Sequence, residues 1–351
     1  HQNNAGFSQS GGGANLNLST GLSFIGNSIS SNTASVGGGV NMYLGGTNVS
    51  YSLVGNIVTN NAANGGHGGG MWVAIGGSSS SYDIRDNRFS SNSCTAGWAV
   101  GGGLYIQING PNNTSTLLSN TIADNSSGGG GGGACIDAFT TSIMTMYDNN
   151  VFGNASWMGA GLSIRWPSNN VGLAQFSLRG NTIANNDARA VGSGNGLGGG
   201  MSVANFGGNG GLIVNLASNA ITGNIARGGQ AGGIGRGGGI YITQSNPWTV
   251  TTISLLGNEN TGAFNALTGN TADLGSAIYN DLLHNKNGSN DIQAGFVCWG
   301  GLDPHPNVSL TCPPKPDPGA MRVPKNPGGV QETLEDEADK AFGGTDCGET
   351  S

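Results

Sequence analysis

The stretch that decides the fold is Asn27-Ser28-Ile29-Ser30-Ser31-Asn32, in which an apolar residue lies between two asparagines five positions apart. This pattern occurs eight times, with its first asparagine at Asn27, Asn56, Asn87, Asn120, Asn149, Asn181, Asn219 and Asn265. By subtraction, successive copies lie 29, 31, 33, 29, 32, 38 and 46 residues apart. Self-similarity at such a period indicates a solenoid, in which each repeat buries its apolar side only against neighbouring repeats.

A glycine run follows each copy, at residues 37–39, 68–70, 101–103, 131–133, 159–161 with an alanine inside, 198–200, 237–239 and, in a degenerate form, 275–277. Apolar residues alternate with polar ones around both motifs. The position two after the first asparagine is apolar in every copy, from Ile29 to Leu267, and apolar pairs such as Val40 and Met42 follow the glycine runs. A period of two is typical of β-strands.

Repeats of about thirty residues that hold several short strands joined by Gly and Asn turns predict coils of a right-handed parallel β-helix, about 4.8 Å apart. A helical solenoid is excluded because each interior glycine costs a helix about 1 kcal/mol, and the chain contains 68 glycines. The sequence therefore predicts an all-β solenoid of about 8–9 coils over residues 1–300, beginning in mid-coil. A disulfide-stapled end at 301–312 and an extended Pro-rich acidic tail at 313–351 complete the expected organisation.

The repeated asparagines and glycines have an architectural role in such a coil. Asparagine tolerates the left-handed turn conformation, and identical side chains stacked once per coil can form a hydrogen-bonded ladder. Glycine supplies positive φ and lets the backbone turn tightly. We therefore interpret Asn27 and its equivalents in the other copies as a structural ladder without catalytic duty.

Three segments carry a resemblance to a known family: FIGNSISSNTASVGGGV from Phe24, ITGNIARGG from Ile221 and LTGNTADLGSAIYN from Leu267. They resemble the repeats of polymorphic outer-membrane proteins, over roughly Phe24 to Tyr279. The resemblance implies a right-handed parallel β-helix of the pectin-lyase-like superfamily and a role as a surface adhesin or passenger. The wider β-helix class also includes polysaccharide lyases and hydrolases.

Charge is sparse and unevenly distributed along the chain. Charged residues make up 9% of the sequence, and the net charge is −7. Residues 313–351 contain eight acidic and four basic residues, which gives −4 and leaves −3 for the rest. This balance argues against a nucleic-acid partner, and no apolar run is long enough to span a bilayer. We expect an extracellular or cell-surface protein without a metal or cofactor.

The start of the sequence resembles the second half of a coil, so we expect His1 to begin a processed or partial product. An open first coil exposes apolar side chains and a strand edge, which solenoids cover with a cap or a partner. Head-to-tail association with another copy and a missing upstream domain are the two explanations left open.

Five cysteines suit an extracellular setting. We expect Cys298 and Cys312 to form a disulfide that staples the last coil. Cys94 falls in a column of small residues and is expected to be a buried thiol, whereas Cys135 falls in an outward column. A disulfide between Cys135 and Cys347, within or between chains, is an alternative, because an odd count leaves at least one thiol unpaired or intermolecular.

The acidic residues before the tail form no recognisable catalytic pair. The candidate residues are Asp83, Asp86, Asp124, Asp137 and Asp148. Two carboxylates beside a sugar can act as acid and base, or assist a lyase together with calcium, but these residues do not share one column. Histidines such as His67 have neither metal-ligand spacing nor a Ser or Cys partner, and read as solvated loop residues. The sequence therefore favours a protein without enzyme activity.

One column of outward-facing residues is better suited to binding a ligand than to catalysis. It places aromatic residues on successive coils, Trp72 with Tyr105 and Tyr241 with Tyr279. Such a flat aromatic surface can stack on sugar rings or on another protein. The alternative is cross-strand packing that stiffens the sheet.

Lengthened turns form a second candidate surface. Residues 187–197 and 225–236 extend consecutive coils and carry Arg189, Arg227 and Arg236. Insertions on one face often mark the working face of a solenoid. These arginines suit an acidic polysaccharide or an acidic tail such as residues 332–339, and flexible surface decoration is the alternative.

Glycosylation sequons provide further candidate sites if the source is eukaryotic. Those in predicted loops are Asn48, Asn112, Asn113, Asn287 and Asn307. The sequence predicts an extracellular structural or adhesive protein, a filament subunit joined to copies of itself through coil ends and tail, with glycans as further candidate partners. The alternative is a β-helix protein that binds or degrades polysaccharides.

Overall fold

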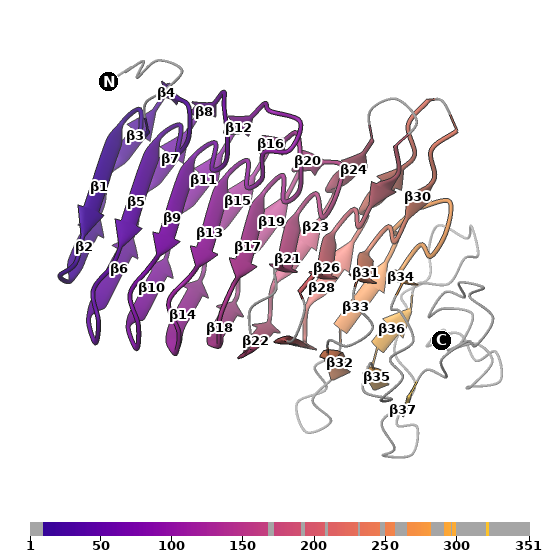
Figure 1. The fold of residues 1–351 in the computed structure, drawn as a ribbon. Coiled ribbons are helices and arrows are strands. Elements are labelled where there is room, and N and C mark those ends of the chain that lie inside the picture. Colours follow the sequence, from indigo (N-terminus) through magenta and orange to yellow (C-terminus); the bar gives the residue numbers. More distant parts are fainter. Residues whose placement is uncertain are drawn as a thin grey trace, which may run out of the picture.

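The computed structural model describes residues 10–167, 172–190, 194–207, 210–230, 232–245, 250–256, 265–281, 291–295, 297–299 and 321–322. Over these residues the chain is all-β and winds as a right-handed parallel β-helix, with one coil stacked on the next along a single axis (Figure 1). The predicted fold class is therefore confirmed. No helix long and apolar enough to cross a membrane occurs in the described part of the chain.

Each coil contributes one strand to each of several long sheets, and strands of equal rank pair in parallel register. The first sheet contains β1 (Ala14–Leu18), β5 (Val40–Leu44), β9 (Met71–Ile75), β13 (Leu104–Ile108), β17 (Ala134–Ala138), β21 (Leu162–Trp166), β26 (Met201–Asn205), β31 (Ile240–Gln244) and β34 (Ile278–Asp281). The second sheet contains β2 (Leu22–Ile25), β6 (Ser50–Val54), β10 (Ser81–Arg85), β14 (Asn113–Leu118), β18 (Ser142–Tyr147), β22 (Gly172–Arg179), β27 (Gly210–Ala217), β32 (Val250–Leu256), β35 (Asp291–Gly295) and an antiparallel β37 (Met321–Arg322).

Shorter strands complete the coil. The third sheet contains β3 (Ser28–Ser30), β7 (Ile57–Thr59), β11 (Arg88–Ser90), β15 (Thr121–Ala123), β19 (Asn150–Phe152), β23 (Thr182–Ala184), β28 (Ala220–Thr222), β33 (Asn265–Thr268) and β36 (Val297–Trp299). The fourth sheet contains β4 (Thr33–Ala34), β8 (Ala62–Ala63), β12 (Ser93–Cys94), β16 (Ser126–Ser127), β20 (Ala155–Ser156), β24 (Asp187–Arg189) and β29 (Ile225–Arg227). The two lengthened turns add a pair of their own, β25 (Gly196–Leu197) with β30 (Gly235–Arg236).

The inward columns form one continuous apolar core between the sheets. Met42, Val73 and Ile106 follow one another in register along the first sheet, and each is fully buried. Burial of a side chain of this size contributes about 1.5–3 kcal/mol. In the first described coil, Leu16 continues this column and Phe24 continues the column of Leu53 on the second sheet, and both are only partly buried. The core is therefore built coil by coil.

Asparagine side chains link the coils at the turn between the second and third sheets. Asn56 accepts at Oδ1 from the backbone N–H and the Nδ2 of Asn27, at 3.0 and 2.9 Å. Its own Nδ2 donates to Oδ1 of Asn87 at 2.9 Å and to the carbonyl of Phe24 at 2.8 Å. This first ladder continues to Asn265. A second ladder runs beside it through Asn32, Asn61, Asn92, Asn125, Asn154, Asn186, Asn224 and Asn270.

The glycine runs pack against the second ladder. Gly68 opens its run with a φ of +66°, which favours glycine. Gly70 closes the run, and a Cβ added there would lie 2.8 Å from Cγ of Asn92 and 2.5 Å from the carbonyl oxygen of Gly103. Such contacts are too short for a real side chain. The asparagine and glycine motifs of the repeat therefore depend on each other inside the coil.

We expect Asn149→Ala to lower the free energy of unfolding by about 3 kcal/mol or more, because buried donors and acceptors lose their partners. Asn149 accepts two hydrogen bonds from Asn120 and donates to Leu117 and Asn181. The matched control is Asn150→Ala, since Asn150 is exposed on β19 and should change stability by about 0.5 kcal/mol at most. Urea denaturation followed by circular dichroism measures both, and equal losses would contradict a structural ladder.

Candidate functional site on the outer face of the first sheet

Three of the four outward aromatic residues are buried and Trp72 is partly buried, so the expected exposed aromatic surface is wrong and the alternative of cross-strand packing holds. Tyr105, Tyr241 and Tyr279 are only 3%, 4% and 0% exposed. The segments that lead into the glycine runs lie over the first sheet and cover them, with Val100 against Tyr105 and Leu197 against Tyr241 and Tyr279. The residues pack in pairs across coils: Trp72 lies 6.0 Å from Tyr105, and Tyr241 lies 5.8 Å from Tyr279, between ring centroids.

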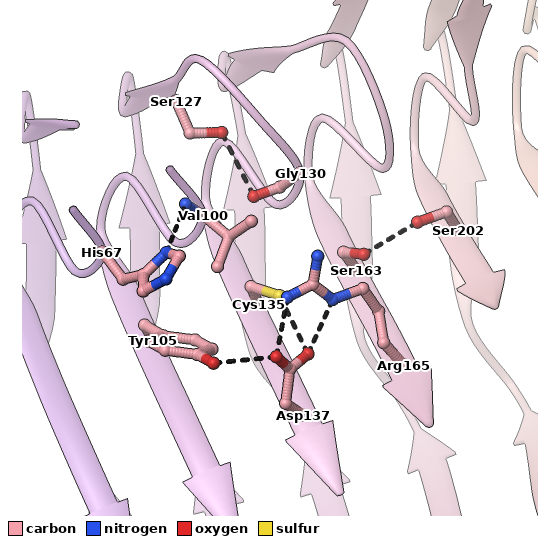
Figure 2. Close-up of polar contacts among 10 residues, drawn as sticks. All are labelled: His67, Val100, Tyr105, Ser127, Gly130, Cys135, Asp137, Ser163, Arg165 and Ser202. Atoms are coloured by element: carbon pink, nitrogen blue, oxygen red, sulfur yellow. Dashed lines mark hydrogen bonds and ion pairs between the residues drawn. The ribbon is translucent and has the colours of Figure 1, made fainter. Parts of the chain in front are cut away.

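A group of buried polar side chains lies under the covering segments of the first sheet and has no equivalent in the other coils that the structure describes. We call Tyr105, Cys135, Asp137 and Arg165 the Asp137 cluster; its members come from the neighbouring strands β13, β17 and β21. Nε and Nη2 of Arg165 contact Oδ1 and Oδ2 of Asp137 at 2.6 and 2.7 Å. The Tyr105 hydroxyl donates to Oδ2 at 2.8 Å. Figure 2 shows these side chains reaching across the strands toward one carboxylate.

The electrostatics of the Asp137 cluster keep its proton donors protonated. Asp137 is almost fully buried, so its charge depends on the bidentate contact with Arg165. Burial raises the pKa of Cys135 well above its ordinary value. Burial, followed by the negative charge of Asp137, raises the pKa of Tyr105. The raised pKa values keep the thiol and the phenol protonated at neutral pH, and the contacts of Asp137 with Tyr105 and Arg165 link three successive coils.

His67 joins the cluster to an exposed tryptophan. Its Nδ1 accepts the backbone N–H of Val100 at 3.1 Å, and its ring lies 4.9 Å from Trp98 and 5.0 Å from Tyr105, between ring centroids. Burial, with the charge of Arg165, lowers its pKa, and Asp137 opposes that shift. The interpretation of His67 as a solvated loop residue is therefore wrong. Trp98 is 63% exposed and is held edge-on by this ring.

Sequence reasoning missed both the Asp137 cluster and Trp98, although a signal was present. The column that contains Asp137 and Arg165 holds Ala74, Gln107 and Ala204 in the neighbouring coils. A charged pair between small or neutral residues is a local departure from the repeat. In a solenoid such departures mark positions that the architecture does not require.

The predicted arginine surface divides into two parts. Arg189 and Arg227 are paired in register on β24 and β29, and both contact Asp187. Arg236 lies apart from them, with its guanidinium 5.4 Å from the ring centroid of Tyr279. Two of the three arginines therefore form one surface, and the third packs against an aromatic ring.

The other acidic residues that the sequence analysis named as candidates lie in turns or form a surface ion pair. Asp83 contacts Arg85 at 3.0 Å. Asp86, Asp124 and Asp148 have φ values of 56°, 57° and 53°, each directly before a ladder asparagine. No group of three His, Cys, Asp or Glu side chains within the described ranges is arranged to hold a metal ion.

Cys94 and Cys135 are free, buried thiols. Burial raises the pKa of Cys94 to about 12. Cys135 lies on the outer face of β17 as expected, but the covering segment buries it completely, so an outward thiol available for pairing is not observed. Cys298 lies in β36, whose side chains are not described, and Cys312, Cys347 and the tail apart from β37 lie outside the described residues.

The candidate glycosylation sites differ in accessibility. Asn48 and Asn112 are exposed in turns with left-handed φ values of 56° and 58°. Asn113 is buried, and its Nδ2 donates to the carbonyls of Gly77 and Gly110 at 2.8 and 2.6 Å. Asn113 is therefore not an accessible glycan acceptor, contrary to expectation. The sites at 287 and 307 lie outside the described residues.

In comparisons with known proteins, no protein-family model, no curated protein and no solved structure matches this chain. The geometry described above is therefore the basis for any functional argument. Its distinctive elements are the Asp137 cluster, the exposed Trp98 beside His67, and the Arg189–Arg227 pair.

We expect Arg165→Met to destabilise the fold by about 3–5 kcal/mol, because it leaves the Asp137 carboxylate buried without its counter-charge. The double variant Asp137→Leu/Arg165→Met removes both charges and should recover most of that loss. Urea denaturation of the parent, both single variants and the double variant measures the coupling. Strictly additive losses would show that the two side chains do not act as a pair.

Stability should fall as the pH drops through the ordinary histidine pKa of 6.5. The pKa of His67 is lower in the folded chain than in the unfolded chain. As the pH falls, the unfolded chain therefore binds the proton first, which stabilises the unfolded state and lowers the free energy of unfolding. His67→Asn retains an acceptor for Val100 without a titrating group. Denaturation from about pH 7.5 to about pH 5 should show the parent losing stability relative to this variant. Parallel curves would contradict a neutral, half-buried His67.

Proposed function

We propose that this protein is an extracellular structural or adhesive β-helix, a subunit of a surface filament assembled through coil ends and docking of the acidic tail. The observation that carries the proposal is the first described coil. Among the described residues, its strands β1–β4 pair only with the next coil, and Leu16 and Phe24 continue core columns while partly exposed. This edge has the register and chemistry of an interior coil, so another copy's coil can extend it.

Two further considerations support a surface role. The resemblance of the repeats to polymorphic outer-membrane proteins favours cell-surface presentation, with a staple between Cys298 and Cys312 and glycans at the exposed Asn48 and Asn112 as part of the same proposal. The Asp137 carboxylate is bound by Arg165 and Tyr105. A carboxylate engaged in this way supports coil cohesion better than acid–base chemistry.

The second candidate function is polysaccharide binding, and a specific observation favours it. Trp98 presents most of its ring to solvent and is oriented by His67. A rigid, exposed aromatic ring suits stacking on a sugar. Cleavage is the weaker form of this alternative because it needs a second, uncommitted acid or base beside Asp137.

Electron microscopy of the full chain, with its mass in solution by light scattering, tests the filament proposal. We expect regular filaments whose repeat is this chain. Leu16→Glu places a charge in this partly exposed apolar column and should abolish assembly while circular dichroism still reports β-structure. The matched control Asn17→Glu changes the exposed neighbouring residue on β1 and should assemble normally. A uniform monomer from the unaltered chain would contradict the proposal.

A further inference from the structure

Arg189 and Arg227 form a cationic pair at the side of the solenoid. They are register partners on β24 and β29, so their backbones lie one coil apart, about 4.8 Å. Their side chains are 67% and 56% exposed. Two guanidinium groups on adjacent coils repel each other unless an anion lies between them.

Among the residues that the structure describes, the anion that contacts the pair is a single carboxylate oxygen. Nε and Nη2 of Arg189 both contact Oδ2 of Asp187, at 2.7 and 2.6 Å. Nη2 of Arg227 reaches the same Oδ2 only at 3.7 Å. The carboxylate of Asp273, which is close in sequence to the bridge between Ile225 and Thr271, accepts the backbone N–H of Gly235 at 2.6 Å. One oxygen thus compensates two arginines, and the pair retains an excess of positive charge.

A partly exposed aromatic residue lies on the coil before Arg189. Trp157 directly follows Ser156, whose register partner is Ala188, so it occupies the coil before Arg189. Its partly exposed ring packs against the cluster of Met158 and Leu197. Trp157, Arg189 and Arg227 thus come from three successive coils, at or just after the ends of β20, β24 and β29.

We propose that Trp157, Arg189 and Arg227 form a binding strip for an acidic polysaccharide that lies along this axis. The arginines would bind carboxylate or sulfate groups in bidentate fashion, and Trp157 would stack on a sugar ring. The spacing of the coils is comparable with the length of one pyranose unit. This inference specifies a ligand for the adhesive role proposed above, and it rests on that proposal. An acidic peptide would use the arginines but gain little from the aromatic ring, so the observations favour the polysaccharide.

Affinity electrophoresis of the full chain in polygalacturonate, dextran sulfate and unmodified dextran tests this inference. We expect retardation by one or both acidic polymers and none by dextran; the first two polymers distinguish carboxylate from sulfate. Arg189→Gln/Arg227→Gln should weaken binding at least tenfold. The control Arg85→Gln/Arg179→Gln removes the same charge from exposed positions on the second sheet and should bind like the parent. Trp157→Leu keeps an apolar contact and should weaken polymer binding without changing the affinity for free sulfate.

Three results would overturn the inference: no binding by the parent, equal weakening by the control pair, or arginine-dependent binding of a peptide of residues 331–340 in place of the polymers. Electron microscopy of the same samples separates this inference from the proposed function. Filaments that bind no acidic polymer would contradict the binding strip but not the filament proposal. Monomers that bind the polymer through these arginines would support the binding strip and contradict the filament proposal.

Discussion

The structure depends on the hydrogen bonds that asparagine side chains make between successive coils. Each interior ladder asparagine accepts from the preceding coil, donates to the following one and caps a backbone carbonyl, as Asn56 does with Asn27, Asn87 and Phe24. These contacts satisfy buried polar groups at a turn, where strand pairing is interrupted. Because the second ladder packs against the closing glycine of the runs up to Gly239, side chains are excluded there and the coils can approach to β-sheet spacing.

Regular stacking also determines where chemistry can arise. Parallel register brings residues far apart in sequence onto one outer face, so a few departures from the repeat suffice to assemble a polar group such as Asp137 with Arg165. The lengthened turns at β25 and β30 act in the same way on the side of the solenoid. Both features lie outside the core, and the ladders continue unchanged beneath them. The repeating architecture and the departures from it therefore occupy separate parts of these coils.

The sequence predicted the features that repeat and failed on those that do not. Periodicity placed Met42 and Val73 in the core because alternation has a direct physical cause in the strand. It placed Tyr105 on the outer face but could not show that Val100 and its neighbours cover it, because the segments before the glycine runs share no pattern. The Asp137 cluster needs side chains from three coils, so no single repeat contains its signal. Trp98 was overlooked because its segment varies between repeats.

The ladders give the solenoid a direction. Every asparagine-to-asparagine side-chain bond of the first ladder runs the same way, with the Nδ2 group of the earlier coil pointing to the Oδ1 atom of the later one, from Asn27 to Asn265. The amide dipoles therefore align along the axis, and the two faces of any coil are chemically unlike. A face of acceptors complements only a face of donors. Two copies that meet end to end can match only when both point the same way, so growth by this route would be polar and would not close into a symmetric pair.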